Sequence, residues 1–398
     1  MSEQTSTNGT NGGSPLAVAP PQVAALQALE ANLRSALLER DEAIRAALVA
    51  VLSRQHVVLL GPPGTGKSML VNELASRIGG GLSTFTLLLT RFTTPEELFG
   101  PISVAGLKKD EYRRLTAGKL PEAHMAFLDE IFKANSAVLN ALLTLLNERQ
   151  FDNGPTRLTC PLLTCFGASN EMPQGDDLGA LWDRFALRLI VDYVGDSAFG
   201  KLLRLNGASA SAPVTLSNAD LEALQGDAAR LPVPESVIEA LITLRRELGS
   251  KGVTASDRRW RQSLALLRAN ALLEGRNVVE EDDLGILGHS LWTTPDQRQE
   301  IARTVARMAN PLNAKALELL DQAASVHEQA MKVQASEADD EQKMHAAVEG
   351  NTKLKKITTH LKRLAEQAES EGRSGVKIAQ AQQRIATMRQ DVANLVLN

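Results

Sequence analysis

The chain has 398 residues, of which 43% are hydrophobic and 23% charged, so it is long enough for about two or three domains with a sizeable core. Lys plus Arg number 43 and Asp plus Glu number 47, which gives a formal net charge of -4. This near balance makes no whole-chain case for a polyanion partner, so nucleic acid is not indicated. The first residues lack a basic segment followed by an apolar one, and no apolar run approaches the roughly 20 residues that cross a bilayer. We therefore expect a cytoplasmic protein with no membrane span.

The first half of the chain alternates between predicted helices and strands. Residues 1–19 are rich in Ser, Thr, Gly and Asn and predict a disordered tail. Apolar residues then recur at helical spacing from Gln22 to Leu52, which predicts two helices before the strand "HVVLL". The later strand-like runs "FTLLL", "MAFLDE", "LLTCFGA" and "LRLIVDY" alternate with helical stretches. This alternation predicts a three-layer α/β sandwich with a parallel sheet over residues 20–204.

The second half is predicted to be helical. A joint rich in Gly, Ser and Ala covers residues 204–218, and the sequence after it has no clear strands, which predicts a small helical lid domain over 205–312. From 313 to 398 apolar residues alternate spacings of three and four, with "ESEGRSG" as a turn. We predict a long antiparallel helical hairpin whose apolar seam is too narrow to form a core alone. A solvated helix acting only as a spacer is the alternative. The predicted seam joins Leu354, Ile357, Leu361 and Leu364 to Ile385, Met388, Val392 and Leu395.

The chain has two cysteines, Cys160 and Cys165, in "LTCPLLTCFGASN". Their spacing matches no zinc or redox pattern. We expect buried free thiols.

The stretch "GPPGTGKS" fits the phosphate-loop pattern G-x-x-x-x-G-K-[S/T], and it lies between a predicted strand and a predicted helix. Gly64 and Gly66 allow the backbone to curl so that its N–H groups face phosphate oxygens, and the following helix N-terminus adds a favourable dipole. Lys67 should reach the β- and γ-phosphates, and Ser68 should hold Mg²⁺ through its hydroxyl. The predicted nucleotide-binding residues are Gly61, Pro62, Pro63, Gly64, Thr65, Gly66, Lys67 and Ser68.

A pair of carboxylates follows the apolar run Met125 to Leu128 in "HMAFLDE". A buried strand would deliver Asp129 and Glu130 to its carboxyl end, the edge at which parallel sheets bind ligands. Asp129 would then hold Mg²⁺ through its shell, and Glu130 would orient or deprotonate the attacking water. Two adjacent carboxylates can also cap the next helix, but the phosphate loop before them favours the catalytic role. A base placed for water favours a hydrolase over a phosphotransferase.

The order of several motifs resembles the MoxR-type AAA+ ATPases, most closely the RavA-like branch. The resemblance covers about residues 25–295 and rests on "GPPGTGKS", "TRFTTPEELFGP", "HMAFLDEIFKANSAVLNALLTLLNERQF", "ASNEMP", "LWDRFALRL" and "SDRRW". It implies that Asn170 is the polar sensor that positions water or reads the γ-phosphate. It also implies that Arg184 is an arginine finger acting on the nucleotide of a neighbouring subunit. An arginine at a helix end could instead pair with a surface carboxylate.

Two further places carry an implied role with more than one interpretation. The region "SDRRWRQ" matches the place of a sensor arginine that contacts nucleotide, and the register allows Arg261, Arg259 or Arg258. In "NERQF", Glu148 and Arg149 lie on an edge that faces a neighbour in the resembling family. An intramolecular surface pair between these two residues is the alternative.

The resemblance implies an ATP-hydrolysing ring, expected to be hexameric, with ATP and Mg²⁺ bound between subunits. Its implied work is chaperone-like remodelling or maturation of a protein client, with a partner that carries a von Willebrand factor A domain. A nucleotide-gated assembly scaffold with little turnover is one alternative. An ATP-driven DNA motor or loader is the other, although no added basic, aromatic-interleaved module is evident. A RavA protein also has a small β-structured insertion beyond its helical domain, whereas only long helices are predicted here.

Overall fold

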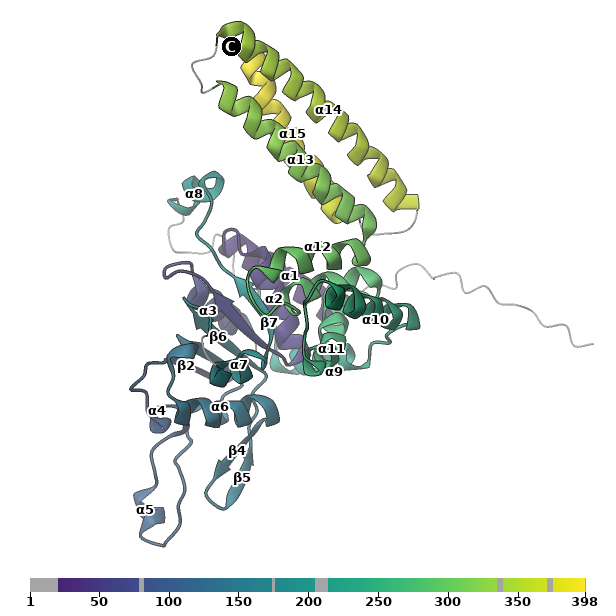
Figure 1. Ribbon diagram of the computed structural model, residues 1–398. Helices are drawn as coiled ribbons and strands as arrows, with labels where there is room; N and C mark the ends of the chain where they lie inside the picture. The colour runs from purple at the N-terminus through teal and green to yellow at the C-terminus, as the bar shows by residue number, and fades with distance from the viewer. Residues whose placement is uncertain are drawn as a thin grey trace, which may run out of the picture.

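The computed structural model describes residues 21–78, 82–173, 176–204, 214–334, 339–370 and 375–397. The predicted disordered tail and most of the predicted joint before the lid lie outside these ranges. The two predicted N-terminal helices are confirmed as α1 (Pro21–Ala36) and α2 (Asp41–Ser53). They lead into the first strand of the sheet (Figure 1).

The centre of the protein is a five-stranded parallel sheet with the strand order β2-β3-β6-β1-β7. Every residue of β1 and β6 is buried, and because alternate side chains of a strand point to opposite faces, both faces of the central sheet are covered. This confirms the predicted α/β class with a parallel sheet. The strands are β1 (His56–Leu60), β2 (Thr84–Leu88), β3 (Met125–Asp129), β6 (Thr164–Ser169) and β7 (Phe185–Ile190).

Helices from the crossover connections cover the sheet. Helix α3 (Lys67–Arg77) packs against β3 and β6, and α1 lies against it. Helix α6 (Ser136–Glu148) contacts α7 (Asp176–Trp182).

Both predicted cysteines are buried free thiols, and burial raises the pKa of Cys160 to about 11 and that of Cys165 to about 12.

Two elements that the sequence analysis missed project together from the sheet (Figure 1). One is the antiparallel hairpin of β4 (Gln150–Asn153) and β5 (Thr156–Thr159), and the other is a loop bearing α4 (Pro95–Phe99) and α5 (Val104–Leu107). Asn153 joins them, because its Oδ1 accepts from the backbone N–H of Arg114 at 2.6 Å. The hairpin strands are polar, so they lack a buried strand's apolar run. The signal that could have predicted them is the two-residue turn Gly154–Pro155, whose first residue is a glycine with a φ of +63°.

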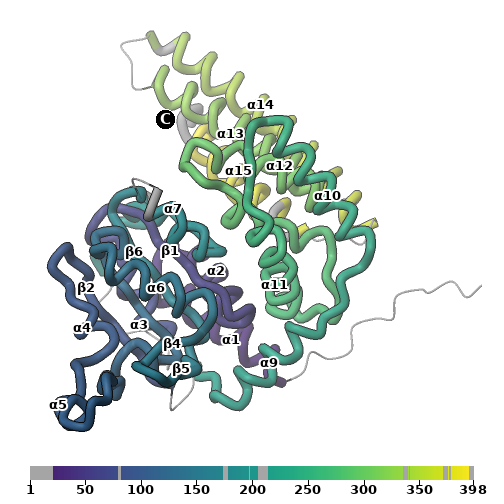
Figure 2. The backbone as a smooth tube through the Cα atoms, turned by 60° about the horizontal axis from the view of Figure 1, so that its bottom comes forward, coloured from purple at the N-terminus to yellow at the C-terminus, as the bar shows by residue number. Residues whose placement is uncertain are grey.

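The lid is helical throughout its described residues, as predicted. Helix α11 (Asp257–Leu273) packs against α2 and α9 (Asn218–Arg230), so the lid core is continuous with the core of the α/β part. A short helix, α8 (Asp196–Leu202), was not predicted and stands apart from the lid (Figure 1). Figure 2 shows the lid helices beside the α/β part from another side. The lid elements are α9 (Asn218–Arg230), α10 (Glu235–Ser250), α11 (Asp257–Leu273), the 3-10 segment η3 (Glu281–His289) and α12 (Gln297–Ala309).

The C-terminal region is a three-helix bundle and not the predicted two-helix hairpin. The hairpin is present as α14 (Asp340–Ser370) and α15 (Val376–Leu397), but α13 (Pro311–Gln334) packs against both and completes a core of its own. Alanines form most of the buried stripe of α13, and small side chains give a weak hydrophobic pattern. That is why the third helix escaped the prediction. Leu395 of the predicted seam lies among residues whose side chains are not described.

Among the described residues, no helix has the length and apolarity needed to cross a membrane.

Candidate nucleotide-binding site

The phosphate loop has the strand, loop and helix context that the sequence predicts. Strand β1 ends at Leu60, and α3 begins at Lys67 with Gly66 as its N-cap. Gly64 and Gly66 have φ angles of +80° and +83°, the left-handed region that glycine enters without a steric cost. The N-terminus of α3 therefore turns its free N–H groups toward the loop, which is a favourable environment for an anion.

Lys67 lies in the loop and is nearly buried, with 8% of its surface exposed. Its Nζ donates to the carbonyl oxygens of Gly61 at 2.6 Å and Pro62 at 2.9 Å, and to Oδ1 of Asn170 at 3.1 Å. Burial lowers the pKa of Lys67, whereas the carboxylates of Asp129 and Glu130 act in the opposite direction. The ammonium group thus lies where phosphates would bind, within the field of both predicted acidic residues.

Glu130 has one hydrogen-bond donor and one ion-pair partner at the carboxyl end of β3. Its Oε1 accepts from Nδ2 of Asn170 at 2.6 Å, and its Oε2 lies 3.3 Å from Nζ of Lys133 in η2 (Ile131–Lys133). The backbone of Glu130 is left-handed, with a φ of +52°, an uncommon conformation for a residue other than glycine and one found often at functional sites. The structure therefore brings the predicted residues Lys67, Asn170 and Glu130 into one connected polar chain.

The groups available for Mg²⁺ are oxygen donors of the kind that this ion prefers. Ser68 lies in the first turn of α3, and the Asp129 carboxylate is close enough to act on the Lys67 charge. Among the described residues, no cluster of three or more His, Cys, Asp or Glu side chains could hold a metal alone. Mg²⁺ commonly takes only one or two protein oxygens and completes its shell with phosphate oxygens and water. The residues present fit that pattern.

Arg40 supports the phosphate loop, and the sequence analysis missed it. Its Nε and Nη2 donate to the carbonyl oxygen of Thr65 at 3.2 and 3.0 Å, and Nη2 also donates to the carbonyl oxygen of Asp192 at 2.7 Å. Arg40 thus ties the loop to the segment that follows β7. No local pattern could indicate this role, because Arg40 lies between two helices and its second partner is 152 positions away.

Arg184 lies at the amino ends of the strands, and the phosphate loop lies at their carboxyl ends. It precedes β7, whose first residue Phe185 pairs in parallel with His56 at the start of β1. One strand length, about 17 Å for five residues, therefore separates Arg184 from the loop of its own chain. Among the described residues, Arg184 forms no ion pair with a carboxylate, and its Nε is buried without a hydrogen-bond partner. The alternative of a surface ion pair is therefore not what forms.

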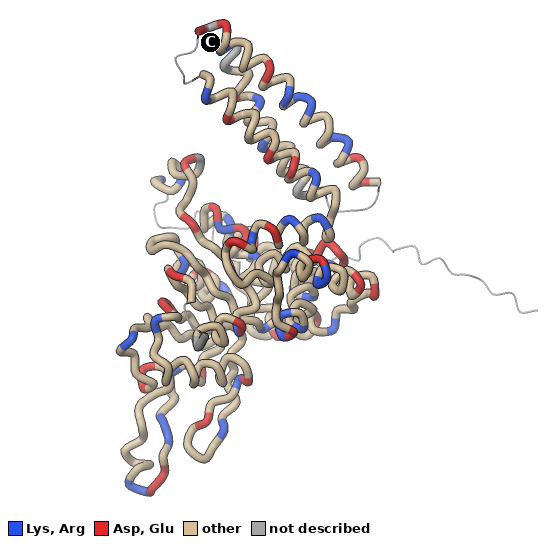
Figure 3. The backbone as a smooth tube through the Cα atoms, viewed as in Figure 1, with Lys and Arg blue, Asp and Glu red and all other residues tan. Residues whose placement is uncertain are grey.

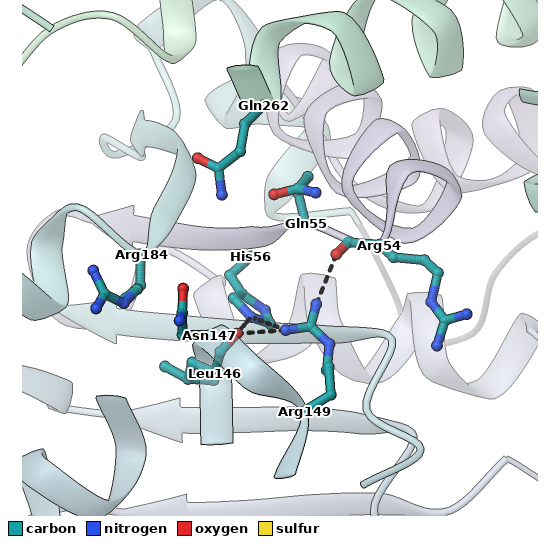
Figure 4. Close-up of a pocket in the computed structure, with 8 residues that line it drawn as sticks. All are labelled: Arg54, Gln55, His56, Leu146, Asn147, Arg149, Arg184 and Gln262. Atoms are coloured by element: carbon teal, nitrogen blue, oxygen red, sulfur yellow. Dashed lines mark hydrogen bonds between the residues drawn. The ribbon is translucent and has the colours of Figure 1, made fainter. Parts of the chain in front are cut away.

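A pocket of about 280 Å³ opens beside Arg184 at this edge (Figure 4). Arg149 lies in its wall, but its guanidinium donates to the carbonyl oxygens of Leu146 and Arg54 and does not pair with Glu148. Burial, followed by the nearby Arg149 charge, lowers the pKa of His56 to about 3, so the ring is neutral. The pocket is lined by Arg54, Gln55, His56, Leu146, Asn147, Arg149, Arg184 and Gln262.

Two of the three candidate sensor arginines, Arg258 and Arg259, contact Asp183, the residue before Arg184, away from the phosphate loop of their own chain. Arg259 is 4% exposed and its Nε donates to Oδ1 of Asp183 at 3.1 Å, while Arg258 lies 3.7 Å from Oδ2 of the same carboxylate. Arg261 follows in the same helix and is exposed. The structure therefore does not bring this cluster to Lys67.

Comparison with known proteins agrees with this geometry. Residues 24–226 match the family described as the MoxR domain in the MoxR-vWA-beta-propeller ternary systems, and residues 236–305 match an AAA lid domain. An uncharacterized protein of Methanocaldococcus jannaschii is 39% identical over 296 residues, which cover 74% of this chain and 78% of that protein.

More distant similarities point the same way. The chaperone MoxR1 of Mycobacterium tuberculosis is 25% identical over 320 residues, covering 73% of this chain and 84% of that protein. The crystal structure of an ATPase candidate from Cytophaga hutchinsonii has the same fold, with a TM-score of 0.59 and 19% identity over 73% of this chain and 95% of that one. The chain belongs to the MoxR family of AAA+ ATPases.

Proposed function

We propose that this protein is an ATP-hydrolysing MoxR-type ring, expected to be hexameric, in which each ATP site is shared by two subunits. One observation carries the proposal. The residues suited to bind and hydrolyse the nucleotide meet at one end of the strands. Arg184 lies at the other end, and its buried Nε has no hydrogen-bond partner among the described residues. A single chain therefore supplies one half of an ATP site at each end of its strands.

The binding half would act through the phosphate loop. Lys67 and the N–H groups at the start of α3 would hold the phosphates, and Ser68 and Asp129 would hold Mg²⁺, which when bound neutralises phosphate charge. Lys67 would leave the carbonyl oxygens of Gly61 and Pro62, which accept from it now, and turn toward phosphate oxygens.

Glu130 would then act as the base. Its carboxylate would exchange its contacts with Asn170 and Lys133 for the attacking water, and accept a proton from that water. Asn170 already bonds both Lys67 and Glu130, so its amide is suited to orient the water between the γ-phosphate and the base.

Arg184 would complete the site of a neighbouring subunit. Because its own loop is about one strand length away, its side chain cannot reach the γ-phosphate that this loop would hold. An arginine supplied in trans stabilises charge on the transferred phosphoryl group. ATP binding would close the interface, hydrolysis would loosen it, and the movement would act on a bound protein client.

The matched family supports a partner with a von Willebrand factor A domain, since its description names vWA and beta-propeller proteins together with MoxR. Chaperone-like maturation of a client is the corresponding work, in line with the relative named chaperone MoxR1. The RavA-like assignment and the cytoplasmic location stay predictions.

Steady-state phosphate release, measured with and without DNA, tests this function. The proposal expects Mg²⁺-dependent release that DNA does not stimulate. Lys and Arg are interspersed with Asp and Glu along the described backbone, a pattern that gives no specific support to a DNA motor (Figure 3). Phosphate release no faster than in a reaction without protein would support a scaffold. Stimulation of release by DNA would support a motor or loader.

A further inference from the structure

The residue before the proposed finger, Asp183, is bonded to the lid. Its Oδ1 accepts from Oγ of Ser256 at 2.8 Å and from Nε of Arg259 at 3.1 Å, and its Oδ2 lies 3.7 Å from Nη1 of Arg258. Ser256 is the N-cap of α11, so all three partners come from the start of one lid helix. The carboxylate next to Arg184 is thus anchored outside the α/β part of the chain.

The lid side of this contact is rigidly built. Nη1 of Arg259 faces the carbonyl oxygens of Leu291 at 3.4 Å and Trp292 at 3.3 Å, and Oγ1 of Thr293 at 3.3 Å. A guanidinium that is 4% exposed and bonded on several sides is costly to move, because it would have to leave all of these acceptors at once. Arg259 is therefore suited to hold Asp183 in place.

A second contact holds the other side of the finger. Arg188 is fully buried in β7, stacks over the Trp182 ring at 4.5 Å from its centroid, and donates to the carbonyl oxygens of Trp182 and Trp292. The rings of Trp182 and Trp292 meet at 5.5 Å. Residues on both sides of Arg184 are thus fixed to the lid segments around Ser256 and Trp292.

Some other ties between the lid and the α/β part attach elsewhere. Arg45 of α2, for example, bonds Asn270 and Glu274 near the end of α11, far along that helix from Ser256. Asp183 is different because a single peptide joins it to Arg184.

We infer that Asp183 is a positioning residue that couples Arg184 to the lid, so that the finger reaches a neighbouring ATP site only when the lid is correctly placed. This inference rests on the proposed shared site. It also gives Arg259 a role inside its own subunit, which is to hold Asp183.

Mixed rings test the inference. The donor subunit carries Lys67→Ala, so it cannot hold phosphates but can supply Arg184, and the acceptor subunit carries Arg184→Ala. Asp183→Asn is then added to either subunit. It keeps an oxygen that can accept from Ser256 and Arg259, so folding should persist, and it removes the charge that orients the guanidinium. In the donor it should lower the complemented hydrolysis about tenfold or more, because small misplacement of a catalytic group is costly. In the acceptor it should change hydrolysis less than twofold.

Arg259→Lys in the donor is the second variant and should give the same donor-specific loss, because a lysine cannot reproduce the planar fork. Asp257→Ala in the donor is the matched control, since Asp257 follows Ser256 in the chain and, within the described part of the structure, forms an exposed ion pair with Arg245 and does not contact Asp183. It should leave the complemented rate unchanged. Thermal unfolding and copurification of tagged subunits confirm that each variant folds and enters rings.

The outcomes separate the two claims. Loss from the donor alone supports the positioning role. Complementation that Asp183→Asn leaves intact in the donor, or lowers equally from either subunit, overturns that role and leaves the shared site standing. No complementation before Asp183 is changed, in rings shown to be mixed, overturns the shared site and this role with it.

Discussion

Glu130 has a left-handed backbone, and its carboxylate lies between the amide of Asn170 and the ammonium group of Lys133. The proposed mechanism asks this carboxylate to take a proton, which an amide cannot do. Glu130→Gln should therefore keep ATP binding and ring formation but lower hydrolysis about a hundredfold or more, the scale of losing a positioned base. Phosphate release and nucleotide binding, measured on the same preparation, check this. Near-normal turnover by the variant would remove Glu130 from the role.

His56 gives a prediction about pH. Its Nδ1 accepts from the N–H of Cys165 at 2.9 Å, and its Nε2 lies 2.9 Å from the carbonyl oxygen of Leu146 and 2.8 Å from Nη1 of Arg149. Burial lowers the pKa of His56 to about 3, below the ordinary 6.5. Below pH 6.5 the unfolded chain binds a proton at His56 that the folded chain does not bind. The free energy of unfolding therefore decreases as the pH falls from 6.5 toward 3. Between pH 7 and pH 5 the loss should be about 2 kcal/mol.

The His56 contribution is measured by comparison with His56→Gln, which retains a donor and an acceptor but does not titrate. Asp283 titrates in the opposite sense, because burial raises its pKa to about 6, and it is present in both proteins. The difference in unfolding free energy between the two proteins should change by about 2 kcal/mol over this pH range. An unchanged difference would mean that His56 is protonated in the folded state.

Whether a site residue could be predicted from the sequence depends on whether a local motif carries it or its partners lie far along the chain. Lys67, Ser68, Asp129 and Glu130 could be predicted, because a strand followed by a short motif carries each of them. Asp183 could not be predicted as an anchor, since its lid partners lie 73 and 76 positions further along the chain. Side-chain contacts over such separations depend on how the elements pack, and no local pattern records them.

At the scale of elements, the C-terminal bundle has a strict seven-residue repeat in all three helices. The buried positions at this spacing are Ala316, Ala323 and Ala330 in α13, Ala347, Leu354, Leu361 and Ala368 in α14, and Ile378, Ile385 and Val392 in α15, and Leu312, Asn313 and Ala381 are buried beside them. A repeat of seven keeps one seam facing its neighbours along the whole length of a helix. The predicted pairing of α14 with α15 is part of this core, and α13 adds small residues that let the helices approach closely.

The bundle should tolerate loss of a partly exposed leucine and not of a buried one. Leu361 is fully buried, so Leu361→Ala should lower the unfolding free energy of the bundle by about 2–5 kcal/mol, because it removes packing and leaves a cavity. Leu317→Ala is the matched control, since Leu317 is 37% exposed and its loss should cost well under half of that. Denaturant unfolding of the full chain measures both. ATP hydrolysis by Leu361→Ala should stay normal, and a parallel loss of hydrolysis would contradict an independent bundle core.

Elements with a strong apolar period were predictable, and those without one were not. The buried strands β1, β3 and β6 and the helices α1 and α2 follow from their patterns. Hairpin β4–β5 contains a single buried residue, Phe151, and the stripe of α13 consists largely of alanine, so neither produces a clear pattern. Both fold because other parts of the chain provide contacts, which is a tertiary effect.

On the scale of the whole molecule, the core of the bundle is separate from the core that joins the lid to the sheet. The chain passes from one to the other between Ala309 and Leu312. Deleting residues 313–398 should therefore leave basal ATP hydrolysis intact. If the bundle serves partner docking, the deletion should abolish binding of a von Willebrand factor A domain protein. Size-exclusion chromatography gives the control, because a loss of rings would make the bundle an assembly element.

The central claim is that two subunits build one ATP site. Lys67→Ala removes the phosphate contact and leaves Arg184, whereas Arg184→Ala removes the finger and leaves the phosphate loop. Each variant alone should be inactive, and mixing them should create interfaces with both groups intact. The decisive measurement is phosphate release from rings in which differently tagged subunits copurify. The account predicts that the mixture recovers hydrolysis well above either variant alone. Release that stays at the level of the separate variants, in rings shown to be mixed, would contradict it.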